Sequence, residues 1–218
     1  NTNDNLTLIA TGVGNVVGGA TATANTLTVN AGGGIGIGTA LNTDTSALIL
    51  TSGGVGALGN ITVVEADASN LAIVTAGASS QDVSVTLTTG DLTVGGAIGD
   101  ASDNISLTTS AGNIVGGGFT INANVLTLNA SGGIGIGTAV TADATTYNLT
   151  TAGVAAAGNI SLIDTGALNS TQINTLVTAA SVQTVSLTAT NADLTIGAAI
   201  GNTNDNLTLI ATGVGNVV

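Results

Sequence analysis

The side chains that could do chemistry in this 218-residue chain are almost all acidic, because it has twelve Asp and Glu residues and no Lys, Arg, His or Cys. Several of these acids stand beside Asn or Ser in short polar segments between apolar runs. Clusters of carboxylate, amide and hydroxyl oxygens are the ligand set that Ca²⁺ prefers. The candidate calcium ligands are Asp4, Asp100, Asp103 and Asp205. The competing interpretation is that these acids belong to exposed turns and bind no ion.

The missing residue types exclude most other chemistry. Without His, Cys or Lys, the sequence offers no catalytic triad, no Schiff-base lysine and none of the soft ligands of zinc, haem or iron–sulfur sites. A pair of carboxylates can hydrolyse a glycosidic bond, but a single Tyr, a single Phe and no Trp leave no aromatic platform for a sugar. We therefore expect a protein that is not an enzyme and that has no cofactor unless it binds calcium.

The net charge of −12 limits the partners as well. Affinity for DNA or RNA comes mainly from Lys and Arg side chains that neutralise phosphates, so we expect no nucleic-acid partner. Polar residues interrupt every apolar run before it reaches the roughly 18 to 20 residues that a membrane-spanning helix needs. We therefore expect no insertion into a membrane.

The elements that position the acids follow from an internal repeat. Residues 1–17, NTNDNLTLIATGVGNVV, recur without change at 202–218, which is a period of 201 residues. A looser duplication lies within this period, because AGGGIGIGTA at 31–40 returns as ASGGIGIGTA at 130–139. We expect one repeat of a longer array, with no true domain boundary. Its parts are a first half-repeat at 1–99, a second at 100–201 and the start of the next repeat at 202–218.

Short strands are predicted by alternating sequences such as Asn5-Leu6-Thr7-Leu8, because apolar and polar residues then face opposite sides of a strand. In the first half-repeat the apolar anchors are separated by 21, 21, 13, 24 and 20 residues. These anchors are Leu6, Leu27, Leu48, Ile61, Val85 and Ile105. Units of this length are too short for domains and suit the turns of a solenoid that stack by parallel pairing. We predict an all-β parallel β-solenoid with about 20 residues per coil, since ten coils divide the 201-residue repeat.

The use of Gly and Pro is also typical of a solenoid. The 33 Gly residues supply the left-handed conformations of sharp corners, and Pro is absent, as expected where nearly every backbone N–H pairs with the next coil. Asn at the start of many strands either forms a side-chain ladder between coils or favours the preceding turn. The alternative architecture is a tandem array of immunoglobulin-like sandwiches, whose domains are also about 100 residues long.

The pattern N-[LI]-[TS]-L…GN-[IV]-V-GG, together with DLT-[VI]-G-x-AIG, resembles the long repeat regions of filamentous-haemagglutinin-like adhesins and related autotransporter passengers. The resemblance covers the whole chain. It implies a right-handed parallel β-helix within a giant secreted surface protein of a bacterium. It transfers no catalytic or binding residue, because the repeats of that family serve as a shaft.

We therefore expect a structural repeat of an extracellular fibrous protein that forms a protease-resistant filament, stalk or sheath at a microbial cell surface. The expected partner is the protein itself, through end-to-end stacking of coils or lateral bundling. The alternative function is adhesion, in which the shaft contacts a cell surface or a glycan.

Overall fold

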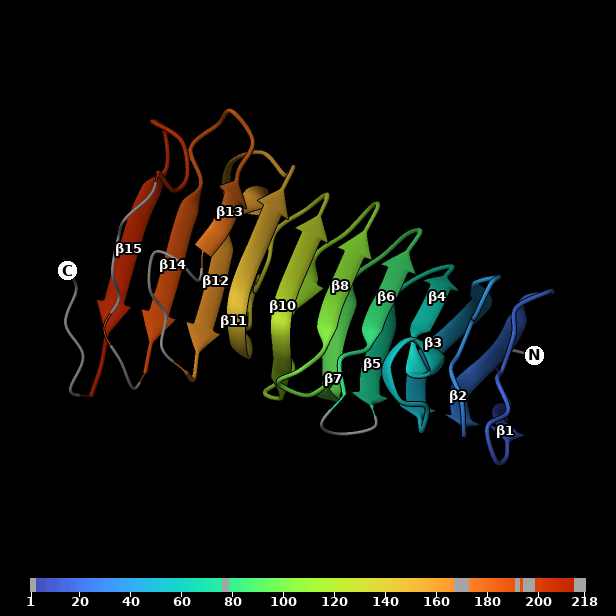
Figure 1. Ribbon diagram of the computed structural model, residues 1–218. Helices are drawn as coiled ribbons and strands as arrows, with labels where there is room; N and C mark the ends of the chain where they lie inside the picture. Colours follow the sequence, from blue (N-terminus) through green and yellow to red (C-terminus); the bar gives the residue numbers. More distant parts are fainter. Residues whose placement is uncertain (1–2, 76–78, 167–172, 191–192, 194–198, 214–218) are drawn as a thin grey trace.

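Apart from two short 3₁₀ helices, the helices and strands of the described residues are all β-strands, and they stack along one long axis (Figure 1). The computed structural model describes residues 3–75, 79–166, 173–190, 193 and 199–213. The strands are β1 (Asn5–Ala10), β2 (Ala22–Ala31), β3 (Leu41–Ser52), β4 (Ile61–Glu65), β5 (Ser69–Val74), β6 (Asp82–Leu87), β7 (Leu92–Ile98), β8 (Asn104–Thr109), β9 (Ile114–Val115), β10 (Thr120–Ala130), β11 (Val140–Thr151), β12 (Ile160–Asp164), β13 (Ile173–Val177), β14 (Thr184–Ala189) and β15 (Asn206–Ala211). Two short 3₁₀ helices, η1 (Gly56–Gly59) and η2 (Ala155–Gly158), lie at corners.

Each strand pairs with a strand about one turn away along the chain. In the first turns, Leu27 of β2 lies between Leu6 of β1 and Leu48 of β3. All pairings between the described strands are parallel. Immunoglobulin-like sandwiches are antiparallel, so that alternative is wrong. The predicted all-β parallel β-solenoid is confirmed.

The pairings divide the coil into two layers of strands, here called stack A and stack B. Stack A begins with β1 and continues through the second parts of β2 and β3 to β5 and β7. Stack B begins with the first parts of β2 and β3 and continues through β4, β6 and β8. β2 and β3 contribute to both stacks because Asn25 and Ser46 drop out of the pairing. β10 and β11 divide in the same way, and beyond them β12, β14 and β15 extend stack A while β13 extends stack B.

The 201-residue period makes about nine turns of roughly 22 residues, instead of the ten turns of about 20 that the anchor spacings suggest. The difference arises because Leu48 and Ile61 resemble anchors of successive coils but lie in the two stacks of one turn. Leu48 pairs with Leu71 in stack A, and Ile61 pairs with Val83 in stack B. The short spacing of 13 residues between these anchors is therefore about half a turn.

The two half-repeats occupy opposite stacks. β1 lies in stack A, whereas β8, its counterpart 99 residues later, lies in stack B. An offset of 99 residues divided by roughly 22 residues per turn is 4.5 turns. The second half-repeat therefore presents the features of the first after a rotation of about half a turn around the long axis. Accordingly, η1 follows a strand of stack A, and η2 follows a strand of stack B at the opposite edge of the rod.

The GIGIG segments form loops that bulge from the strands. Ile35 and Leu41 pair with residues that are only two positions apart on the next turn, so the five residues between them project outward. Gly36 in this loop has a φ of +67°, and a Cβ there would lie 2.0 Å from the carbonyl oxygen of Thr62. Gly135 has a similar φ of +72° in the second half-repeat. The motif recurs because only Gly allows the adjacent turn to approach so closely.

The corner helices provide a matched pair for testing backbone strain. Gly56 and Ala155 occupy equivalent positions, with φ values of +58° and +52°. We predict that Ala155→Gly stabilises the protein, whereas Gly56→Ala destabilises it by about 1 kcal/mol, because a Cβ disfavours the left-handed region. A Cβ at Gly56 would meet only the Ser80 carbonyl oxygen, at 4.0 Å. The loss of stability in Gly56→Ala therefore comes from the backbone conformation and not from a steric clash. Thermal melting followed by circular dichroism measures both effects, and an unchanged Tm for Gly56→Ala would contradict the prediction.

Candidate functional site: carboxylates at the corners of the coil

Asp103 is a buried carboxylate in the corner between β7 and β8, and its side chain is 0% exposed. Its Oδ2 accepts hydrogen bonds from the Thr75 hydroxyl (2.6 Å) and from the Asp100 backbone N–H (3.0 Å). Its Oδ1 accepts a hydrogen bond from the Gln81 N–H (3.1 Å). Thr75 and Gln81 belong to the preceding turn, so this carboxylate joins two turns of the coil.

Asp205 repeats this arrangement 102 residues later in the sequence. Its Oδ2 accepts hydrogen bonds from the Thr178 hydroxyl (2.7 Å) and the Asn202 N–H (2.8 Å). Its Oδ1 accepts a bond of 3.4 Å from the Gln183 N–H. The corner motif and its donors are therefore a property of the repeat, since both half-repeats contain them.

Of the four predicted calcium ligands, the structure brings together only Asp100 and Asp103. Asp4 is exposed beside β1, and Asp205 lies beside β15 at the other end of the rod (Figure 1). The oxygens of Asp103 and Asp205 already accept hydrogen bonds from groups of the same chain, which a cation would have to displace. The hydrogen bonds of Asp103 and Asp205 hold these corners together, and calcium binding at Asp4, Asp100, Asp103 and Asp205 stays a prediction.

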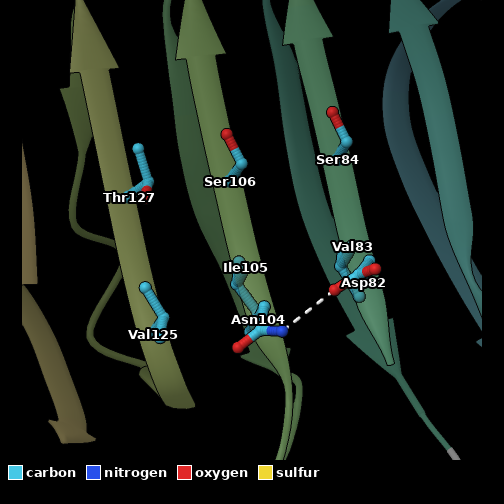
Figure 2. Close-up of a pocket in the computed structure, with 8 residues that line it drawn as sticks. All are labelled: Asp82, Val83, Ser84, Asn104, Ile105, Ser106, Val125 and Thr127. Carbon is cyan, nitrogen blue, oxygen red and sulfur yellow. Dashed lines mark hydrogen bonds between the residues drawn. The ribbon is translucent and has the colours of Figure 1, made fainter. Parts of the chain in front are cut away.

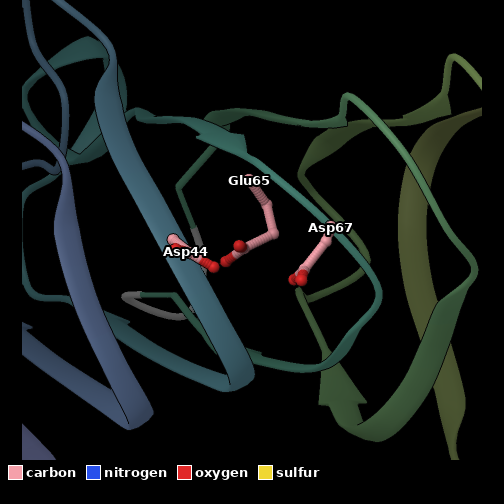
Figure 3. A group of neighbouring side chains, drawn as sticks. All are labelled: Asp44, Glu65 and Asp67. Carbon is pink, nitrogen blue, oxygen red and sulfur yellow. The ribbon is translucent and has the colours of Figure 1, made fainter. Parts of the chain in front are cut away.

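A second group of acids was not predicted from the sequence. The carboxylates of Asp44, Glu65 and Asp67 have oxygens within 4.8 Å of one another (Figure 3). Asp44 lies on β3, Glu65 ends β4 one turn later, and Asp67 follows in the next corner. Asp44 and Glu65 are 21 positions apart, which is about one turn of the coil, but this relation was hidden because Leu48 and Ile61 resemble anchors of successive coils.

Glu65 is fully buried, and donors of its own chain surround its carboxylate. The hydroxyls of Thr43 and Thr45 donate at 2.8 and 2.7 Å, and the N–H groups of Thr45 and Ala66 at 2.8 and 3.0 Å. A buried carboxylate is tolerated only when such hydrogen bonds replace those of water. Glu65 therefore joins the first strands of stack B without needing a cation.

Asp164 occupies the position of Glu65 in the second half-repeat and is also 0% exposed. Ala142 and Ala144 replace the two threonines, so the hydroxyl donors are lost. The Gly166 N–H donates to Oδ1 (3.0 Å), while Oδ2 is buried without a hydrogen bond of good geometry. The same carboxylate position is thus much less well satisfied in the second half-repeat.

The environment of Asp164 shifts its pKa. Burial raises the pKa of Asp164 above its ordinary value of 3.8, and Asp143 adds to this effect. The Gly166 N–H and the nearby Tyr147 hydroxyl lower the pKa in part. Burial also raises the pKa of Tyr147, whose hydroxyl accepts a hydrogen bond from the Ala144 N–H (3.1 Å). Tyr147, the single Tyr of the chain, therefore brings a hydroxyl to the place where the threonine hydroxyls are missing.

A hollow of about 190 Å³ lies across β6, β8 and β10, and most of the side chains that line it are short and polar (Figure 2). The Asn104 amide donates to Asp82 Oδ1 (3.0 Å) across neighbouring turns. The Asn124 amide in turn reaches Asn104 Oδ1 (3.5 Å). The strand-start residues therefore form a partial side-chain ladder between coils, as one of the two interpretations of these Asn residues predicts.

Acidification should stabilise the protein. Burial raises the pKa of Asp103, as it does that of Asp164, above the ordinary value of 3.8. Each of these carboxyl groups therefore has a higher pKa in the folded state than in the unfolded state, and between these two pKa values the folded state binds more protons. The stabilisation is complete below the unfolded-state pKa and is lost as the pH rises through the folded-state pKa. We predict that Tm rises as the pH falls from neutral into this interval. We also predict that Asp164→Asn raises Tm at neutral pH. In this variant Tm should increase less on acidification than in the unaltered chain, and calorimetry at several pH values measures both effects.

Glu65→Gln is the matched control, because it changes the equivalent position in the other half-repeat. The amide of Gln places an NH₂ group against the donors of Thr43 and Thr45. We expect the free energy of unfolding to fall by about 1–3 kcal/mol. If both substitutions lowered Tm equally, the proposed difference between the two carboxylates would be wrong.

The chain matches no protein-family model, no curated protein and no solved structure. Within the described residues, no helix has the length and apolar character needed to cross a membrane. The function is therefore inferred from the residues and their geometry.

Proposed function

We propose that this chain is a structural repeat of an extracellular fibrous protein that forms a filament, stalk or sheath at a microbial cell surface. The observation that supports this proposal is that the sequence starts again after about nine turns of the coil. β15, which has the sequence of β1, therefore returns to stack A in the position from which a further repeat can continue. A period that ended between the stacks would place successive repeats on different sides of the rod.

The distribution of polar groups favours a structural role over a chemical one. The carboxylates of Asp103 and Glu65 are buried and accept hydrogen bonds that join neighbouring turns. The outer faces carry mainly Ser, Thr and Asn on consecutive strands, as Ser84, Ser106 and Thr127 illustrate (Figure 2). These features support a rod whose stability is its function. The proposed surface location follows from the resemblance to secreted adhesin shafts.

The dimensions of the rod follow from the number of turns. Parallel strands lie about 4.8 Å apart, so nine turns advance the axis by about 43 Å for each repeat. A protein with many such repeats would be a long and thin fibre. Because every turn adds the same backbone pairing, its stability would be roughly a sum over turns and interfaces between turns.

Tandem arrays of one, two and three repeats test this proposal. We expect rods in electron micrographs whose length increases by about 43 Å per repeat, and a meridional fibre reflection near about 4.8 Å. Globular beads on a string, or no meridional reflection, would contradict it. If rods instead bound cells or glycans in pull-down experiments, adhesion would become the better assignment.

Resistance to proteolysis is a second consequence. The chain has no Lys or Arg, so trypsin has no site, and elastase must reach backbone that is engaged in parallel pairing. We predict that folded arrays survive elastase far longer than the same arrays kept unfolded in denaturant, as read on gels over time. Similar rates for the two states would show that the pairing gives no protection.

A further inference from the structure

Exposed apolar side chains gather at the corner that contains η1. Val55 and Leu58 are each 69% exposed, and together with Val13 they line a hollow of about 370 Å³. The other residues that line it are glycines and one Asn, so no charged side chain borders the space. Single exposed apolar residues are ordinary on a protein surface, but several around one hollow are typical of an interaction site. We call this feature the η1 hollow.

The η1 hollow does not depend on where the sequence starts. Val55 and Leu58 follow β3, which has a paired strand of stack A on each side. Val13 lies in the first turn, and its counterpart in the second half-repeat is Ala111. Neighbouring turns bond to the chain at and beside Ala111 from both sides, yet Ala111 is exposed. The same hollow is therefore expected in every repeat of a continuing array.

The opposite edge of the rod carries a projecting apolar corner at η2. Val154 is 68% exposed at the start of this helix, and Val182 of the next turn is 56% exposed. The Ala155 N–H donates to the Ser181 hydroxyl (2.9 Å), which holds the two turns together beside both valines. Val154 and Val182 therefore belong to one corner, here called the η2 corner.

The two edges differ at equivalent positions of the half-repeats. Leu58 corresponds to Ala157, so the long side chain beside the η1 hollow is reduced to a methyl group at η2. Val182 corresponds to Ser80, since each stands directly before a buried Gln, so an apolar side chain is added beside η2. One edge therefore offers a hollow bounded by large apolar side chains, and the other offers a pair of exposed valines.

We propose that the η2 corner of one rod docks into the η1 hollow of a second copy of this chain. The inference rests on the proposed function, since it identifies how rods of that kind lie side by side. The two features lie on opposite edges of the rod, so a rod that uses one of them keeps the other free. Such a contact is heterologous and does not close on itself. Its repetition produces a layer of rods, which favours a sheath over an isolated stalk.

Charge and spacing both favour a second copy as the occupant. Each chain has a net charge of −12 and no cationic residue, so two copies avoid repulsion only where uncharged surfaces meet. Both features recur once per repeat, every 43 Å or so, and a partner of another kind would not share this period. η2 begins 99 positions after η1, which is 4.5 turns. Neighbouring parallel rods would therefore be staggered by about 22 Å.

Tandem arrays of three repeats test the docking surface. We expect side-by-side association, in sedimentation velocity and electron micrographs, at concentrations about a hundredfold or more below those that a single repeat needs, because contacts along two rods act together. Leu58→Asp alters the hollow and Val154→Asp the η2 corner, and each variant array alone should stay as single rods. Phe119→Asp, at a 46% exposed residue between β9 and β10, is the matched control for added charge and should associate like the unaltered array.

A mixture of the two variant arrays distinguishes this contact from other modes of association. The Leu58→Asp array keeps its η2 corner and the Val154→Asp array keeps its η1 hollow, so the mixture should form pairs of rods that grow no further. If two hollows met each other instead, the Val154→Asp array alone would associate, and the proposal would be wrong. Circular dichroism verifies folding. If Leu58→Asp does not fold, Leu58→Ala takes its place, because Ala157 is the natural residue at the equivalent position.

Unaltered arrays that stayed as single rods at every concentration, or mixed variants that did not pair, would overturn the docking surface. If those rods still lengthened by about 43 Å per repeat, the proposed function would stand, so the two failures are distinguishable.

Discussion

Parallel backbone pairing between residues about 22 positions apart is the interaction on which this structure depends. Each strand supplies hydrogen-bonding groups to the turn before it and to the turn after it, so any residue that interrupts the pairing interrupts the rod. This constraint accounts for the absence of Pro. It also accounts for Gly36, where the carbonyl oxygen of the adjacent turn occupies the space of a Cβ. The corners, in contrast, accept acids because a carboxylate can bind free N–H groups there.

The half-turn relation between the half-repeats gives each edge of the rod the same kind of corner. The hydrogen-bond donors at equivalent corners differ between the two half-repeats. Glu65 is held by the hydroxyls of Thr43 and Thr45, whereas Asp164 has lost such donors and lies beside Tyr147. A buried carboxylate persists at both places although its partners differ. The position is therefore retained by the geometry of the corner, and its stability depends on which donors the neighbouring turn supplies.

Strands of the same sequence mark the same place in successive repeats. β15 has the sequence of β1 and pairs with β14 in stack A, so the start of the next repeat continues the parallel pairing of this one. The absence of cationic residues leaves no side chain on this chain to pair with the acids of a neighbour. Association through uncharged surfaces avoids this difficulty, whereas contact between acidic corners does not.

The sequence by itself determined the short strands and the 201-residue period, because alternation and exact repetition can be counted along the chain. It favoured parallel stacking but left immunoglobulin-like sandwiches open, and the pairing of strands such as β2 and β3 decided between them. It did not determine the number of turns, since Leu48 and Ile61 have the same alternating surroundings although they lie in different stacks. Nor did it show that Glu65 is buried with Thr43 and Thr45. Only the tertiary structure decided these points, because they depend on which residues one turn places beside the next, and that choice is made by the register of backbone pairing across the whole coil.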